Sequence, residues 1–316
     1  MLILNWITSW QVIALNKYEK EYLKANIKDE KKSLEELEEL YEKALKDINL
    51  KIRNLLEHPE MSSKIYQAKY QIALRKQIEK ALDDIKDYDS IIDYLEKCYE
   101  RGYIGTMYDI AMQGIPLIIP IDQEQVANAI FKETKLSDGL YSRLGYNKKQ
   151  LAKELNKEIS RGIATSSSFS DVSININKRF GIGMRKSYLI ARTEGHRVLT
   201  TSSYHAQLQA KDKGCNIVKQ WDSTLDGRTR PSHRMVDGEI KDIDEKFSNG
   251  LLYPSDPDGQ ASEVVNCRCA LLQRATWALD EEELNTLKER ASFYGLDKTN
   301  NFDEFTDRFL NATKGE

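Results

Sequence analysis

Side chains that can bind a metal or transfer a proton are concentrated in two short stretches, residues 221–239 and 263–272. The first reads WDSTLDGRTRPSHRMVDGE, and the second, EVVNCRCALL, contains a Cys-x-Cys pair. Neutral imidazole and thiolate are good Zn²⁺ ligands, and a structural zinc site normally takes four ligands in a tetrahedral array. The sequence therefore offers His233, Cys267 and Cys269 as metal ligands. The candidates for the fourth ligand are Cys215, Asp226, Asp237 and water.

The two cysteines of the Cys-x-Cys pair have a second interpretation. If Cys267 and Cys269 lie on a β-strand, they share one face of it and both sulfurs can reach one ion. Buried free cysteine, however, commonly acts as a small core residue without any metal. Of the two interpretations, the core role is preferred, and a structural zinc ion is kept as the alternative.

The charged residues of the first stretch also allow two interpretations. Asp226, Arg228 and Arg230 crowd into one turn, where arginine can bind phosphate and aspartate can hold a metal or act as a base. Alternatively, an arginine pairs with Asp237 or Glu263 and pins loops across a small domain that has little core. The second interpretation is preferred, because small domains need such cross-links. His233 has the side chain of a general acid or base, but no nucleophile signature lies beside it, so a hydrogen-bonded structural role is preferred.

The helix before these stretches contributes a further pair of polar residues. Glu194 and His196 are two positions apart, so they point to different faces of a helix. We expect Glu194 to contact the motif domain, His196 to be exposed and Trp221 to be a core anchor. The predicted structural cluster comprises Glu194, Trp221, Asp226, Arg228, Arg230, His233, Asp237, Glu263 and Asn266.

The positions of proline and the spacing of apolar residues predict the elements that carry these side chains. None of the six prolines falls between Pro120 and Pro231, so we expect helices before about residue 220 and irregular α+β structure after it. Apolar residues from Leu34 to Leu55 recur every three or four positions, which predicts a long amphipathic helix. Ser33 has the form of a capping box, although a helix that runs through it is the alternative, and Ser170 or Asp171 is expected to cap a later helix.

The predicted fold is a mainly α N-terminal helical region, followed by a small α+β domain and a helical tail. The corresponding segments are 1–184, 185–275 and 276–316. Within the second segment, residues 185–211 read as one helix, and residues 216–223 and 264–273 read as strands.

Composition limits the class of protein. The net charge is −3 and basic stretches such as residues 147–161 are diluted by carboxylates, so a dedicated nucleic-acid reader is not indicated. Nonspecific attraction to DNA phosphates remains compatible with these stretches. No run approaches the roughly 20 apolar residues of a membrane span. The apolar start of the chain, residues 1–24, lacks the features of a signal peptide and is expected to be an amphipathic helix that docks on a neighbour.

The order of the motifs resembles a known family. IARTE in a helix, Trp221, DGRTRPSH, DGE, PSDP and NCRC follow one another between Ile190 and Leu272, as in the Mu F-like head morphogenesis family of tailed phages and prophages. The resemblance implies a minor head protein, placed inside the virion near the portal and present in the host cytoplasm during assembly. It implies portal protein and capsid or scaffold protein as partners, with nonspecific contact to packaged double-stranded DNA and no membrane. It does not imply an enzyme.

An enzymatic alternative is a metal-dependent nuclease in the C-terminal domain. It requires His233 and the carboxylates to converge on a vacant, solvent-open point. A third alternative is a purely structural zinc module, in which two sulfurs and a third ligand lie about 2.3 Å from a common point.

Overall fold

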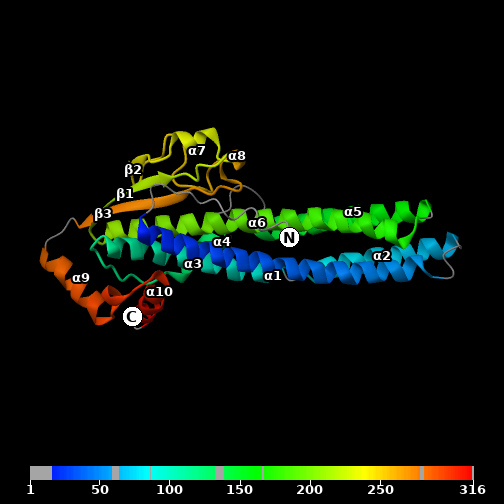
Figure 1. Ribbon diagram of the computed structural model, residues 1–316, viewed down its shortest axis with the longest axis horizontal. Helices are drawn as coiled ribbons and strands as arrows, with labels where there is room; N and C mark the ends of the chain where they lie inside the picture. Colours follow the sequence, from blue (N-terminus) through cyan, green and yellow to red (C-terminus); the bar gives the residue numbers. More distant parts are fainter. Residues whose placement is uncertain are drawn as a thin grey trace. The chain divides into compact units, whose positions relative to one another are not determined.

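The computed structural model describes residues 16–58, 64–85, 87–131, 139–165, 167–277 and 281–314. The described chain is mainly helical and adds one small antiparallel sheet near its C-terminal end, which confirms the predicted fold class (Figure 1). The expected N-terminal docking helix lies largely outside the described residues. Among the helices of the described ranges, none is both long and apolar enough to cross a membrane.

The elements follow one another in three groups. The first six helices are α1 (Lys17–Leu56), α2 (Lys64–Asp83), α3 (Asp87–Met112), α4 (Gln123–Phe131), α5 (Gly139–Ala164) and α6 (Phe169–Asp212). The mixed region holds β1 (Cys215–Asp222), α7 (Pro231–Met235), β2 (Ile240–Asp242), α8 (Ala261–Val264) and β3 (Ala270–Trp277). The tail holds α9 (Glu281–Phe293), the 3-10 helix η3 (Leu296–Lys298) and α10 (Phe302–Thr313).

The chain forms two compact units, each built from separated segments. Unit 1 comprises residues 1–30, 94–136 and 193–316, and unit 2 comprises residues 31–93 and 137–192. Helices α1, α3 and α6 each contribute residues to both units. This grouping by compactness is a different division from the three sequence segments, which remain a prediction.

The helix boundaries decide one open alternative and correct two expectations. Helix α1 begins at Lys17 and runs through Ser33, which is the alternative to a capping box that the sequence left open. Helix α6 is continuous from Phe169, so the residues expected to form two helices form one. Its first turn is capped by Ser168, whose Oγ accepts from the Asp171 amide at 3.2 Å, and not by Ser170 or Asp171.

Unit 2 is held by a buried polar network at its centre. The Tyr41 hydroxyl lies 2.6 Å from Ser187 Oγ and donates to Asp87 at 3.1 Å. Lys148 pairs with Asp87 at 2.7 Å, and Asn147 donates to Ser187 at 2.9 Å. Asp87 and Ser187 are fully buried, and a buried network whose members satisfy one another favours one arrangement of the helices over others.

Within unit 1, α3 and the last turns of α6 approach closely at a glycine. A Cβ built on Gly102 would lie 2.2 Å from the backbone oxygen of Leu199 and 2.1 Å from Ser202 Oγ. The Ser203 hydroxyl donates to the Gly102 carbonyl at 3.2 Å. Glycine is therefore required here by the distance between the helices, since any side chain would push them apart.

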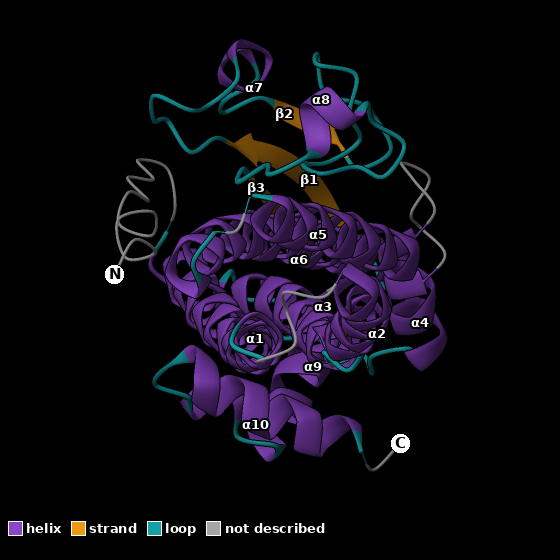
Figure 2. Cartoon of the chain, turned by 90° about the vertical axis from the view of Figure 1, so that its right-hand side faces the viewer, coloured by secondary structure: helices purple, strands orange, loops and turns teal. Residues whose placement is uncertain are grey.

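The sheet has the order β2-β1-β3, and both pairings are antiparallel. The C-terminal part of α6 lies on one side of the sheet, and α7 and α8 lie on the other (Figures 1 and 2). Gln207 of α6 donates to the Leu272 carbonyl at 3.3 Å. Lys219 of β1 is fully buried, and its ammonium donates to the carbonyls of Ile243 and Leu252, each at 2.8 Å. The hydrogen bonds of this buried ammonium group therefore attach the irregular 243–252 segment to the sheet.

The C-terminal end of β1 carries a carboxyl group with an altered acidity. Asp222 is 5% exposed, and burial, together with the charges of Asp237 and Glu19, raises its pKa to about 7. Arg274 acts in the opposite direction and lowers the pKa. The folded chain therefore binds a proton at Asp222 that the unfolded chain releases near pH 4.

Replacing Gly102 with alanine should destabilise unit 1 by about 2 kcal/mol, because the new methyl group meets backbone atoms that cannot turn aside. The matched control is Gly181→Ala in the same class of element, where a Cβ meets nothing within 4 Å. The control should stabilise the chain by about 0.5 kcal/mol through the helix propensity of alanine. Urea unfolding of both variants measures the two effects, and equal effects would contradict the close approach.

Replacing Asp222 with asparagine should raise the melting temperature at pH 8 but not at pH 4. The folded pKa lies above the unfolded value of 3.8, so wild-type stability falls as pH rises through this window and the ionised carboxylate costs on the order of a few kcal/mol. Thermal melts of wild type and variant from pH 4 to pH 8 test this. A difference that does not change with pH would contradict a raised pKa.

Candidate metal centre

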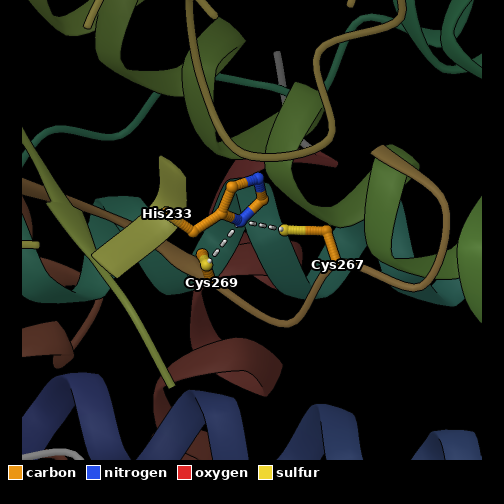
Figure 3. A group of neighbouring side chains, drawn as sticks. All are labelled: His233, Cys267 and Cys269. Carbon is orange, nitrogen blue, oxygen red and sulfur yellow. Dashed lines mark hydrogen bonds between the residues drawn. The ribbon is translucent and has the colours of Figure 1, made fainter. Parts of the chain in front are cut away.

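Three buried side chains converge between α7 and the loop that precedes β3. His233 comes from α7, and Cys267 and Cys269 come from the loop between α8 and β3 (Figure 3). His233 Nδ1 lies 3.3 Å from Cys269 Sγ and 3.7 Å from Cys267 Sγ. Their ligand atoms all lie within 4.8 Å of one another, and the side chains are 1%, 5% and 2% exposed. The predicted metal ligands are therefore brought together.

The cysteines reach this position by a route that differs from the predicted strand. Strand β3 begins at Ala270, so Cys267 and Cys269 lie in the loop before it. Asn266 has a φ of 56°, a left-handed conformation that asparagine tolerates better than most residues. Its amide donates to Thr193 Oγ1 at 3.1 Å, and the Arg268 carbonyl accepts from Thr224 Oγ1 at 2.8 Å. These two bonds fix the backbone on either side of Cys267.

His233 is held by contacts on every side. Pro231 occupies the first turn of α7, where its fixed φ favours the helix. The ring of Trp221, which is fully buried, meets the His233 ring edge-on with centroids 5.2 Å apart. His233 Nε2 lies 3.1 Å from Glu263 Oε2, without the angle of a hydrogen bond, and Glu263 accepts from Ser232 Oγ at 2.7 Å. The ring thus turns Nδ1 toward the sulfurs and Nε2 toward a carboxylate.

The two thiols share their protons unequally. A hydrogen bond from Cys269 lowers the pKa of Cys267, and contacts with His196 and His233 lower it further. The same bond raises the pKa of Cys269. The expectation that His196 is exposed is wrong, because the residue is partly buried and its Nε2 atom is fully buried. The sequence reasoning did not count His196 among the residues of the site.

A bidentate charge pair in the module joins Asp226 to Arg268. Arg268 Nη1 and Nη2 donate to the two carboxylate oxygens at 2.7 and 2.8 Å, a bidentate arrangement. This pair holds the pKa of Asp226 well below its usual range. We expected an arginine of the turn to pair with Asp237 or Glu263. The pair instead joins Asp226 of the turn to Arg268, which lies between the two cysteines.

The remaining cluster residues have separate roles. Arg230 donates to the Val265 carbonyl at 2.5 Å, and the Arg228 amide donates to Asp226 at 2.9 Å. Asp237 accepts from the Ser223 amide at 2.7 Å, and Glu194 pairs with Arg197 at 2.9 Å within α6.

Three of the residues suggested as a fourth ligand lie away from the site or are bonded elsewhere. Asp226 and Asp237 are used in other bonds, while Cys215 stands at the far end of β1, opposite Trp277. None of these three belongs to the group of ligand atoms found among the described residues.

The chemistry open to this arrangement follows from its burial. Imidazole and thiolate groups can hold a zinc ion, but a catalytic zinc site keeps a position open to water or substrate. With His233 and both cysteines at most 5% exposed, a substrate would have to displace the surrounding loops to reach them. The geometry is thus closer to a structural site than to an active site.

Comparison with known proteins finds a family match over part of the chain. Residues 153–272, from α5 to β3, match the family model described as Phage Mu protein F like protein. No solved structure matches the chain significantly. One relative is named minor head protein GP7 of Bacillus phage SPP1, with 29% identity over 254 residues, covering 75% of this chain and 80% of the relative.

Another relative is named NAD(+)--arginine ADP-ribosyltransferase EFV of Enterococcus faecalis (strain ATCC 700802 / V583). It is 26% identical over 300 residues, which cover 90% of this chain. The match spans only 60% of that relative's length. The motif order, the family match over residues 153–272 and the likeness to a minor head protein agree, which confirms the expected resemblance to the Mu F-like family of phage minor head proteins.

Proposed function

We propose that this component of the phage head acts in head assembly next to the portal, and that its 185–275 module is a folded structural unit. The partners would be the portal protein and the capsid or scaffold protein, met in the host cytoplasm before packaging. The observation that carries the structural role is that two carboxylates of the module are bonded within it. Asp226 pairs with Arg268, and Asp237 accepts from a backbone amide, so these carboxylates are occupied.

A groove in unit 2 supports contact with packaged DNA. The groove, of about 860 Å³, lies between α2 and α5. Its lining carries five basic side chains, Arg75, Lys148, Lys149, Lys153 and Lys157, against the two acidic side chains of Glu79 and Asp83. Lysines along a groove attract a phosphate backbone without reading sequence. We therefore assign the nonspecific DNA contact to this groove.

An enzymatic role is the second candidate, and one relative's name favours considering it. That relative is named an arginine ADP-ribosyltransferase, but two fifths of its length lie outside the match with this chain. The nuclease alternative would use His233, whose ring is 1% exposed and packed between Trp221 and the two thiols. Burial argues against either chemistry at this site. A nuclease assay on wild type and His233→Ala, with added Mg²⁺ or Zn²⁺, would reveal activity if this is mistaken.

The placement near the portal is tested by assembly. Full-length chain, expressed with the portal and shell proteins of the same phage, should co-purify with portal oligomers and enter heads in few copies. Quantitative mass spectrometry of purified heads, with and without portal, gives the measurement. Incorporation that is unchanged in portal-less heads would contradict the proposed location.

The structural role of the module predicts strong coupling between Asp226 and Arg268. Asp226→Asn and Arg268→Lys should each destabilise the module by about 1–3 kcal/mol, because each leaves a partly buried partner without its bidentate mate. The double variant should cost clearly less than the sum of the two single changes. Denaturant unfolding of the four proteins measures the coupling, and strict additivity would contradict a shared pair.

DNA binding through the groove predicts a dependence on three exposed lysines. Changing Lys149, Lys153 and Lys157 to glutamine should weaken binding to random double-stranded DNA and reduce the slope of log affinity against log salt by about 3. The matched control changes Lys32, Lys43 and Lys46, which are exposed on α1, and alters net charge equally. Fluorescence anisotropy in a salt series distinguishes the two. Equal losses in both triple variants would contradict binding in the groove.

A further inference from the structure

We infer that His196, His233, Cys267 and Cys269 together form a structural zinc site that joins α6 to the loop before β3. The inference goes beyond head assembly and does not depend on it. It begins with the three side chains whose ligand atoms lie within 4.8 Å of one another. Zinc bonds of about 2.3 Å to sulfur and 2.0 Å to nitrogen, at a tetrahedral angle, place N and S ligand atoms about 3.5 Å apart. The two N–S distances at His233 Nδ1, 3.3 and 3.7 Å, lie on either side of this value.

His196 is the residue in position to complete the set. Thr193, three residues earlier and thus on the same face of α6, accepts from the Asn266 amide at 3.1 Å. The helix face that carries His196 is therefore turned toward the residue that precedes Cys267. The Nε2 atom of His196 is buried without a hydrogen-bond partner among the described residues, and His196 is one of the groups that lower the pKa of Cys267.

Coordination requires the His196 ring to move. Its ligand atoms lie outside the group formed by the other three side chains, so the ring has to shift toward His233 and Cys269. The gain is a closed Cys₂His₂ set, in which both thiols become thiolates that the ion neutralises.

The surroundings of His233 fit those of a metal-bound histidine. A ligating imidazole usually gives its second nitrogen to a carboxylate, which fixes the ring orientation and raises the basicity of the ligating nitrogen. Glu263 Oε2 stands 3.1 Å from His233 Nε2, on the side of the ring away from the sulfurs. Without an ion, the buried polar groups of the site are satisfied mainly by thiols, which are weak donors and acceptors. One bound zinc ion would explain why two buried thiols, two histidines and a carboxylate lie together.

The first experiment measures zinc in the full-length chain, purified without chelator and re-metallated with Zn²⁺ alone. One zinc per chain is expected by mass spectrometry, and removal by a chelator should lower the melting temperature. Cobalt(II) substitution should give the visible spectrum of a tetrahedral site with sulfur ligands. Absence of stoichiometric zinc after re-metallation, or a melting temperature unaffected by chelator, would overturn the site.

The second experiment tests the fourth ligand through His196→Ala, a change that favours the helix. Competition with a chromophoric chelator should show zinc affinity reduced at least tenfold, with the cobalt spectrum changed. The matched control is His205→Ala, on the same helix and also partly buried, whose ring contacts Tyr99 instead of the site. It should leave zinc affinity unchanged. Equal affinity in wild type and His196→Ala would overturn the assignment of His196.

Discussion

The pairing of β1 with β3 is the constraint on which the C-terminal module depends. The register sets Asp222 opposite Ala270 and Trp221 opposite Leu271, across a loop of nearly fifty residues. Whatever follows β1 must therefore lie beside whatever precedes β3. Ser223 Oγ thus lies 3.7 Å from Cys269 Sγ, and Thr224 Oγ1 donates to the Arg268 carbonyl at 2.8 Å. The bidentate Asp226–Arg268 pair and the group formed by His233 with the two cysteines are consequences of this one register.

The sequence carried most of the helical architecture, because apolar spacing and the absence of proline are local signals. It did not show that α6 is one helix. The serine-rich segment contains several possible N-cap residues, and only Ser168 caps the helix. The Cys-x-Cys pair was expected on a strand. A left-handed Asn266, fixed by Thr193, places it in a loop instead, and that bond comes from a residue 73 positions away.

Only some of the residues of the site could be predicted from the sequence. His233, Cys267 and Cys269 stand out because their residue types bind metals, and the structure brings them together. Arg268 and His196 were missed, because their importance comes from partners distant in the chain. One signal was present: Arg268 alternates with two cysteines, so in an extended segment it points away from them and toward a partner of its own.

The module is proposed to be a closed structural unit of a phage head protein, and the side chains of its candidate metal ligands are buried. X-ray absorption at the zinc edge of the purified, zinc-loaded chain tests this most directly, since structural zinc sites are closed and catalytic sites keep an open position. A first shell of two sulfurs and two nitrogens, with Zn–S near ~2.3 Å, is the predicted result. A shell that includes a water oxygen, or one without sulfur, would contradict it.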